Sequence, residues 1–155
     1  VPDEEYVLFV GNSPRKGLPK VRSFAREAPY PVYVVGDVTE SENLRAIGRV
    51  SQTELAEYYS SAIANIHPAN FEAFGNVILE SLACGTPVVV SNQCGAAEIV
   101  DGSCGLVTDN IRAGIESIRN TDADACVETA SRYSWGKVAE STNILLEQLG
   151  HSYYK

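Results

Sequence analysis

Short apolar runs alternate along the chain with longer segments in which apolar residues recur at helical spacing. The runs rich in β-branched residues predict strands at residues 6–10, 32–36, 62–66 and 87–90, a weaker one at 44–47 and a last short one at the end of 102–107. The helical spacing predicts helices at residues 18–28, 52–61, 109–118 and 122–132. Strands that alternate with helices are typical of an open parallel sheet with helices on both faces. We therefore predict a single α/β domain over residues 1–155.

Residues 71–90, FEAFGNVILESLACGTPVVV, predict a loop, a helix, a tight stop and a strand. Four apolar residues share one face at helical spacing: Phe74, Val77, Ile78 and Leu82. Gly75 gives the backbone freedom at the entrance of this helix. At its end, Gly85 can supply a left-handed cap, and Pro87 prevents the helix from continuing. The apolar run that follows has the composition of a strand buried on both faces.

Two carboxylates lie in this stretch, Glu72 just before the helix and Glu80 in its second turn. Glu80 is the only charged residue in residues 73–93, and it shares an arc of the helix with Asn76. Because an unpaired buried carboxylate is costly, Glu80 needs partners. One interpretation pairs it with a surface lysine or a backbone amide, and the other lets it accept hydrogen bonds from ligand hydroxyls. Since free N–H groups at the helix start add an anion site, the second interpretation indicates a nucleotide.

The segments EAFG at residues 72–75 and CGTPVV at residues 84–89, with Glu80 between them, resemble the E-x7-E signature of retaining glycosyltransferases of family GT4. These enzymes have the GT-B fold, in which two Rossmann-like domains face each other across a cleft. The signature belongs to the C-terminal domain, which binds the nucleotide sugar. The resemblance implies that Glu72 contacts hydroxyls of the donor sugar and that Glu80 contacts the ribose. It also implies that the backbone amides just after the first glutamate hold the sugar and the diphosphate.

The loop after the first predicted strand, residues 11–17, resembles the family's G-R-x-x-x-x-K-G loop, whose Arg and Lys contact the donor phosphates. Gly11 and Lys16 match this pattern, whereas Asn12 stands at the position of the Arg and the loop is one residue shorter. Arg15 either replaces the missing cation or is a solvated loop charge. Ligands of open α/β sheets bind beyond the carboxyl ends of the strands, where this loop is expected.

Further segments extend the resemblance over nearly the full chain. GRVS at residues 48–51 resembles the segment whose backbone, near Val50, meets the base. Residues 94–100 resemble a short helix, and residues 133–135 resemble the start of a final helix that runs to residue 150. The resemblance thus implies the C-terminal, Rossmann-like half of a GT-B fold.

His67 directly precedes Pro68, close to the signature. A histidine near a cleft suggests acid–base chemistry, but the family's catalytic-site histidine belongs to the other domain, so we prefer a structural or substrate-lining role for His67. The resemblance implies two catalytic residues, Lys16 and Glu72. The residues that we expect to bind the substrate are Gly11, Asn12, Arg15, Val50, His67, Phe74, Gly75, Asn76, Val77 and Glu80.

The charge of the chain, −8, argues against nucleic-acid binding. Seven of the twelve Lys and Arg residues lie before position 50, and none lies in residues 50–111. The signature therefore brings no cation of its own, and a bound diphosphate must be balanced by helix amides and by cations from the first third of the chain.

No apolar run approaches the ~20 residues that a membrane helix needs, and no signal peptide is visible. We therefore expect a cytoplasmic protein, and peripheral attachment of a full-length enzyme to a membrane stays open. The four cysteines lack C-x-x-C spacing, which argues against a zinc site. The family implies transfer without a metal ion or another cofactor.

The polar start at residues 1–5 looks like the end of a linker, so we expect an N-terminal, acceptor-binding domain outside this chain. That domain would bring a sugar, lipid-linked or other acceptor. The chain by itself is then expected to bind a UDP-, GDP- or ADP-sugar without transferring the hexose. Two alternatives stay open: a nucleotide-binding module without transferase activity, and a GT-B-like sugar-nucleotide epimerase or phosphorylase.

Overall fold

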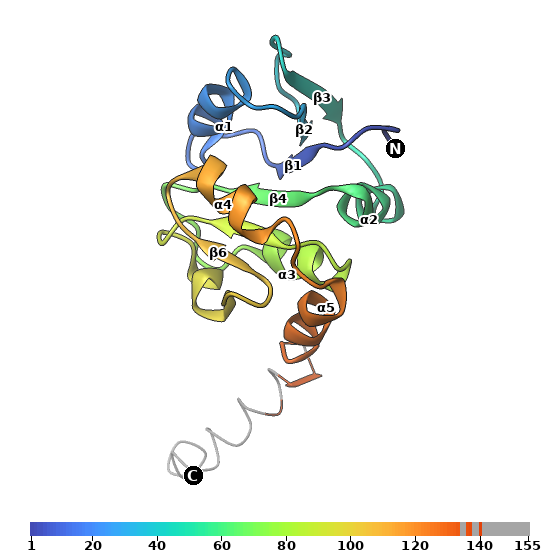
Figure 1. The fold of residues 1–155 in the computed structure, drawn as a ribbon, viewed down its shortest axis with the longest axis vertical. Coiled ribbons are helices and arrows are strands. Elements are labelled where there is room, and N and C mark those ends of the chain that lie inside the picture. The colour runs from blue at the N-terminus through green and yellow to red at the C-terminus, as the bar shows by residue number, and fades with distance from the viewer. Residues whose placement is uncertain (134–135, 138–139, 141–155) are drawn as a thin grey trace, which may run out of the picture.

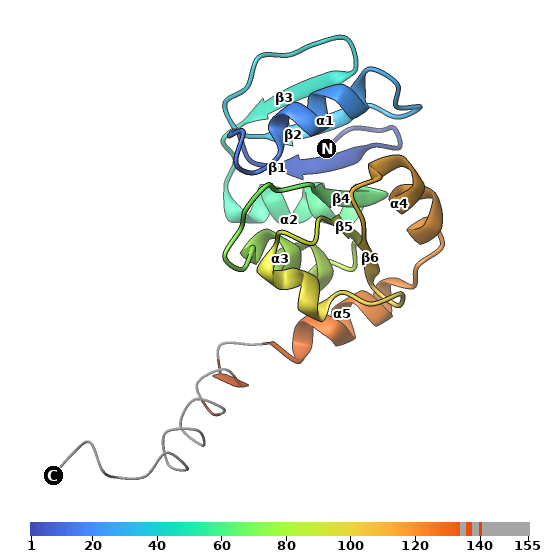
Figure 2. The same ribbon diagram turned by 90° about the vertical axis from the view of Figure 1, so that its left-hand side faces the viewer.

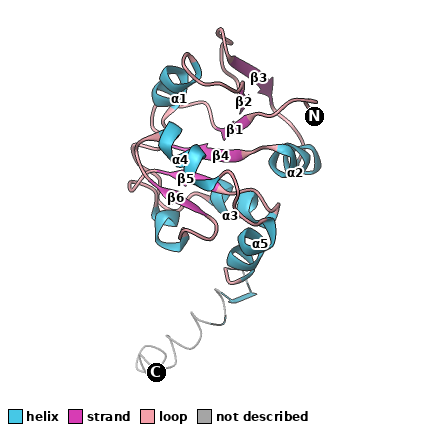
Figure 3. Ribbon diagram, in the orientation of Figure 1, coloured by secondary structure: helices cyan, strands magenta, loops and turns pink. Residues whose placement is uncertain are grey.

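Six parallel strands form one open sheet in the order β3-β2-β1-β4-β5-β6 (Figure 1, Figure 3). The computed structural model describes residues 1–133, 136, 137 and 140. The strands are β1 Val7–Val10, β2 Val32–Val35, β3 Leu44–Gly48, β4 Ala64–His67, β5 Val88–Val90 and β6 Gly105–Val107. All neighbouring strands run parallel, which confirms the predicted α/β sheet.

Helices cover both faces of this sheet (Figure 2). One face carries α1 Leu18–Ala25 and α4 Ile111–Ile118. The other face carries α2 Gln52–Ser61, α3 Asn76–Ala83 and α5 Ala123–Ser131, with a short 3-10 helix, η1 Gly95–Ile99, after β5. The prediction of helices on both faces is therefore confirmed.

Alternate residues of the central strands point to opposite faces of the sheet, and both faces are apolar. Val7 and Phe9 of β1 pack in the core beneath α1 and α4, whereas Leu8 packs on the side of α2. β5 alternates in the same way between the two faces. Burial on both faces explains why these strands are continuous apolar runs in the sequence and do not alternate with polar residues.

The observed helix boundaries differ from the predicted ones where a turn or a polar cap ends the helical backbone. α1 ends at Ala25, three residues early, because a turn follows it. α4 begins two residues late, because the Asn110 side chain caps it. α2 has the predicted bounds, and Ser51 and Glu54 form a reciprocal capping box at its start. The predicted final helix, residues 133–150, lies largely outside the described residues.

The strand order reverses between β1 and β4, because β1 to β3 extend the sheet in one direction and β4 to β6 extend it in the other. In open α/β sheets, ligands bind beyond the carboxyl ends of the strands at this switch point. Two loops leave the sheet there, residues 11–17 after β1 and residues 68–75 after β4. The topology therefore brings together residues 11–17, which resemble a loop that contacts phosphates, and residues 68–75, which we call the signature loop.

Gly17 allows these two loops to touch through their backbones. Its φ is 93°, in the left-handed region that glycine adopts readily. A Cβ atom at this position would lie 2.2 Å from the carbonyl oxygen of Pro68. No side chain fits between the loops at this point, so only glycine permits the observed approach.

We predict that Gly17→Ala lowers the free energy of unfolding by about 2 kcal/mol or more, because it adds left-handed strain to a backbone clash. Urea unfolding followed by circular dichroism measures this change. Gly102→Ala is the matched control, since its φ is not left-handed and nothing lies within 4 Å of its added Cβ. The control should change stability by less than about 0.5 kcal/mol. Equal losses in the two variants would show that the contact between Gly17 and Pro68 does not constrain the fold.

Candidate functional site

The loop after β1 is hydrogen-bonded to the loop after β4. The backbone amide of Asn70 donates to the carbonyl oxygen of Arg15 at 2.9 Å. The side-chain amide of Asn70 donates to the carbonyl oxygen of Pro14 at 3.0 Å. These bonds set the position of Lys16, the residue between Arg15 and Gly17, relative to the signature loop.

The signature loop is held on its other side by residues that follow β5. The Glu72 amide donates to the Gln93 carbonyl at 3.0 Å, and the Gly95 amide donates back to the Glu72 carbonyl at 2.9 Å. The Phe74 carbonyl accepts from the Ala96 amide at 2.7 Å and from the Cys94 thiol at 3.0 Å. Burial raises the pKa of the Cys94 thiol, which keeps it protonated as a donor. The backbone on both sides of Glu72 and Phe74 is therefore fixed.

A pocket of about 290 Å³ opens where the signature loop enters α3. We call it the signature pocket, and it is lined by Lys16, Glu72, Phe74, Gly75, Asn76 and Val77. The six residues include both proposed catalytic residues and four of the proposed binding residues. The structure therefore brings together two segments that lie about 60 residues apart in the chain.

Two features favour negative charge in the signature pocket. Gly75, with a φ of 99°, starts α3 without a capping side chain, so the first N–H groups of the helix are left for a ligand. The half-buried Lys16 reaches the pocket with its side chain over Gly11, where a Cβ atom would lie 2.8 Å from Cδ of Lys16. The pocket thus combines helix amides with one cation.

Glu72 faces the same pocket from a site that is mostly closed to solvent, since its side chain is 15% exposed. Its Oε1 lies 3.9 Å from Nη1 of Arg15, and its Oε2 lies 3.7 Å from Nε2 of His67. Arg15 itself is exposed and also donates to the Phe71 carbonyl at 3.5 Å. The carboxylate therefore lies between the guanidinium of Arg15 and the imidazole of His67 and faces the pocket beside Lys16.

His67, at the end of β4, is buried beneath this loop. Burial lowers the pKa of the imidazole to about 4; Glu72 opposes this shift, whereas Lys16 and Arg15 add to it. Neither ring nitrogen has a hydrogen-bond partner among the described residues. A neutral, enclosed imidazole fits a structural role better than proton transfer at neutral pH.

Glu80 lines a different hollow, of about 430 Å³, between α3 and α5. Asn76 lines both this hollow and the signature pocket, so the two adjoin at the start of α3. Oε2 of Glu80 accepts a hydrogen bond of 3.2 Å from the hydroxyl of Tyr59 on α2. Sequence reasoning considered a lysine, a backbone amide or a ligand as the partner of Glu80 and missed this tyrosine. The available signal was helical spacing, which places Leu55 and Tyr58 or Tyr59 on the inward face of the helix predicted at residues 52–61.

The prediction that Phe74 belongs to the apolar face of α3 is wrong. The left-handed backbone of Gly75 separates it from the helix, which begins at Asn76, and Phe74 is 37% exposed. Ile78 and Leu82 are buried as predicted, and Val77 is half-buried. Phe74 still lines the signature pocket, so its proposed binding role keeps a structural basis.

Five of the expected binding residues line none of the hollows described: Gly11, Asn12, Arg15, Val50 and His67. Gly11 and His67 lie beneath pocket residues, and Arg15 lies beside Glu72. Asn12 is exposed, and Val50 is half-buried before α2. These five residues are therefore not part of the lining of the signature pocket.

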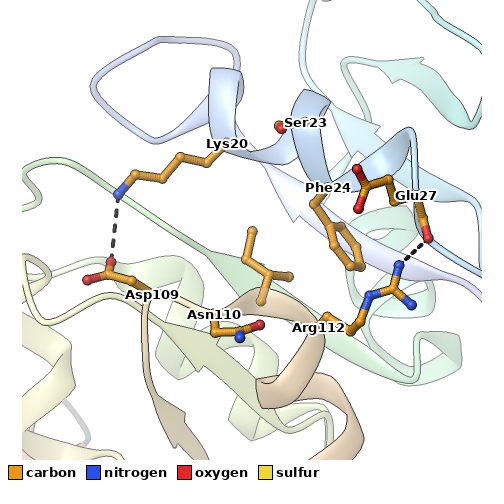
Figure 4. A pocket seen from close by; sticks show the side chains of 8 residues that line it. Lys20, Ser23, Phe24, Glu27, Asp109, Asn110 and Arg112 are labelled. Atoms are coloured by element: carbon orange, nitrogen blue, oxygen red, sulfur yellow. Dashed lines mark hydrogen bonds and ion pairs between the residues drawn. The ribbon is translucent and has the colours of Figure 1, made fainter.

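A third hollow, of about 720 Å³, lies between α1 and α4 (Figure 4). Lys20 pairs across it with Asp109 at 3.7 Å, and Arg112 donates to the Glu27 carbonyl. It shares no lining residue with the signature pocket. The first contact joins α1 to the residues before α4, and the second joins α4 to the turn after α1.

The described residues contain neither a metal-type cluster nor a membrane-spanning helix. No group of three or more His, Cys, Asp or Glu residues is placed to hold a metal ion within that part of the chain. Among the same residues, no helix combines the length and the apolar composition that crossing a bilayer requires.

Comparison with known proteins identifies relatives and a shared fold. A D-inositol 3-phosphate glycosyltransferase of Streptosporangium roseum is 37% identical over 75 residues, which are 48% of this chain and 17% of that protein. A sucrose-phosphate synthase of Thermosynechococcus elongatus superimposes with a TM-score of 0.78 at 26% identity, over 96% of this chain and 46% of that structure. HepE of Anabaena, solved with UDP-glucose, superimposes with a TM-score of 0.74 at 19% identity, over 94% of this chain and 49% of that structure.

The chain spans about half the length of these solved structures and a smaller share of the curated relative. The structural likeness shows the Rossmann-like α/β architecture of GT-B glycosyltransferases. The family model described as glycosyl transferases group 1 matches residues 2–119, which include the whole signature pocket. The chain therefore belongs to the group 1 glycosyl transferases.

Proposed function

We propose that this chain is the donor-binding, C-terminal domain of a retaining GT4 glycosyltransferase that transfers a hexose from a nucleoside diphosphate sugar. The observation that carries the proposal is the signature pocket. It places a carboxylate, a lysine and the start of a helix around one space at the switch point of the sheet. The structure of HepE with UDP-glucose and the glycosyltransferase relatives support a nucleotide sugar as the ligand.

The proposed binding mode follows the charges of the site. Lys16 and the N–H groups of Asn76 and Val77 bind the diphosphate, because helix starts and lysines both favour phosphate. Glu72 accepts hydrogen bonds from hydroxyls of the sugar in the signature pocket. Glu80 accepts a hydrogen bond from the ribose in the adjoining hollow, with Asn76 between the two sites.

The chemistry requires stabilisation of two charges. Negative charge grows on the departing diphosphate, and Lys16 with the α3 amides can stabilise it as the bond to the sugar breaks. Positive charge grows at the anomeric carbon, which the carboxylate of Glu72 can stabilise through space. We propose that this arrangement makes a metal ion unnecessary, because Lys16 and the helix start provide the positive potential themselves.

Calorimetric titration with UDP, GDP, ADP and their hexose derivatives tests the proposed function. One diphosphate should bind, and its hexose derivative should bind more tightly because Glu72 adds contacts to the sugar. Failure of every diphosphate to bind would contradict the proposal. Tight binding without transfer, even beside an acceptor-binding domain, would favour a non-catalytic nucleotide-binding module.

We predict that Glu80→Gln weakens binding of the bare diphosphate on the order of tenfold, because a charged hydrogen bond contributes about 1.5–3 kcal/mol. Glutamine keeps the size of the side chain and an acceptor for Tyr59, so the fold should be preserved. Glu57→Gln, an exposed carboxylate on α2, is the matched control and should bind normally. Unchanged affinity in folded Glu80→Gln would assign Glu80 a structural role.

Glu72→Gln should behave differently. It should leave affinity for the bare diphosphate nearly unchanged and remove about tenfold of the affinity that the hexose adds, because Glu72 faces the sugar side of the pocket. Titrations with a diphosphate and with its hexose derivative measure the two values separately. Equal losses for both ligands would overturn the division of roles between Glu72 and Glu80.

We predict that the chain alone binds donor but does not transfer the hexose. The solved relatives are about twice as long as the chain, which supports a site completed by a second domain. Without that domain no acceptor is positioned, and a proximity contribution of about 7–11 kcal/mol is lost. A radiolabelled-donor assay compares the chain with a form joined to an acceptor-binding domain. Robust transfer by the chain alone would show that no second domain is needed.

A further inference from the structure

The hydroxyl of Tyr59, at the end of α2, reaches one of the two signature carboxylates. Tyr59 is 1% exposed, and its hydroxyl donates a hydrogen bond of 3.2 Å to Oε2 of Glu80. A buried hydroxyl that loses its acceptor is left unpaired, which is costly, so the folded chain favours this bond. The protein therefore fixes one oxygen of Glu80.

The backbone of Tyr59 is also held by hydrogen bonds. Its carbonyl oxygen accepts from the Ala62 amide at 3.0 Å and from the Thr86 hydroxyl at 2.5 Å. Thr86 follows α3, and its own carbonyl accepts from the Ser81 hydroxyl at 3.0 Å. The end of α2 is thereby tied to the end of α3, the helix that carries Glu80.

The charge state of the Tyr59 hydroxyl also matters for its contact with Glu80. Burial and the negative charge of Glu80 raise the pKa of the Tyr59 hydroxyl far above its usual value, so it stays a protonated donor. Within the described part of the chain, no ion pair involves Glu80. A neutral donor orients the carboxylate without neutralising it, whereas a lysine or arginine would compete with ligand hydroxyls for the same charge.

We propose that Tyr59 is a positioning residue for nucleotide recognition, which holds Glu80 by Oε2 so that Oε1 is presented to a ribose hydroxyl. The inference rests on the proposed function, in which Glu80 is the ribose acceptor. Oε1 makes no hydrogen bond with the described residues, and Glu80 lines the hollow beside Asn76. A carboxylate that samples several rotamers must be ordered when a ligand binds, which weakens binding. The bond from Tyr59 orders the carboxylate in advance.

The test compares ribonucleotides with their 2′-deoxy forms in the chain carrying Tyr59→Phe. This change removes the hydroxyl and keeps the buried ring. Calorimetry with UDP, GDP and ADP, each beside its deoxy form, should show that the unchanged chain prefers the ribose form of its ligand about tenfold or more. In Tyr59→Phe this preference should fall to about threefold or less, because Glu80 is no longer ordered.

Tyr6→Phe is the matched control for the loss of a buried hydroxyl. Tyr6 is fully buried in the same core cluster as Tyr59, and its hydroxyl donates to the Tyr58 carbonyl at 2.7 Å. Both variants should lower the thermal unfolding midpoint by a few degrees. Only Tyr59→Phe should change the preference for ribose, so a general loss of stability is separated from a loss of positioning.

A third variant, Glu80→Gln, distinguishes failure of this inference from failure of the proposed function. If Glu80→Gln removes the preference for ribose and Tyr59→Phe retains it, the role of Tyr59 is overturned and the role of Glu80 stands. If Glu80→Gln also retains the preference, or if no diphosphate binds, the proposed function fails and the inference fails with it. An equal change in Tyr6→Phe and Tyr59→Phe would likewise overturn the positioning role.

Discussion

Direct backbone contact between loops at the carboxyl edge of the sheet is the constraint on which the candidate site depends. A Cβ atom at Gly17 would lie 2.2 Å from the Pro68 carbonyl oxygen, and one at Gly95 would lie 2.0 Å from the Ala73 carbonyl oxygen. The signature loop is thus held from both sides with no side chain in between. The signature pocket is the space left where this loop turns into α3, so its shape follows from these two contacts.

The same contacts bring positively charged side chains to a segment that has none of its own. Residues 50–111 contain no lysine or arginine, although they include the helix start and both signature carboxylates. The parallel pairing of β1 with β4 brings the loop after β1 beside the signature loop, and Lys16 and Arg15 come with it. The proposed site for a negatively charged ligand therefore depends on strand order, with the cation and the helix amides supplied by different parts of the chain.

The two signature carboxylates have different surroundings, which suits different roles. Glu72 lies between the guanidinium of Arg15 and the neutral imidazole of His67 beside the signature pocket, whereas Glu80 accepts a hydrogen bond from a buried tyrosine in the adjoining hollow. Helical spacing placed Glu80 away from the apolar core but could not identify Tyr59, because that contact joins residues 21 positions apart on two different helices. Spacing also placed Phe74 on the helix, because it cannot show that the left-handed backbone of Gly75 delays the start of α3 to Asn76.

The sequence by itself determined the elements and their order, because the period of apolar residues and the Gly and Pro stops are local properties of the chain. The resemblance of short motifs to a known family singled out Lys16, Glu72 and the glycine-led helix start as candidate site residues. Only the tertiary structure decided which of them meet: the signature pocket gathers Lys16 and Glu72, and Glu80 turns to Tyr59 in a separate hollow. The burial that lowers the pKa of His67 also depends on the tertiary structure. These properties depend on strand order and on packing between distant segments, which no local pattern of residues encodes.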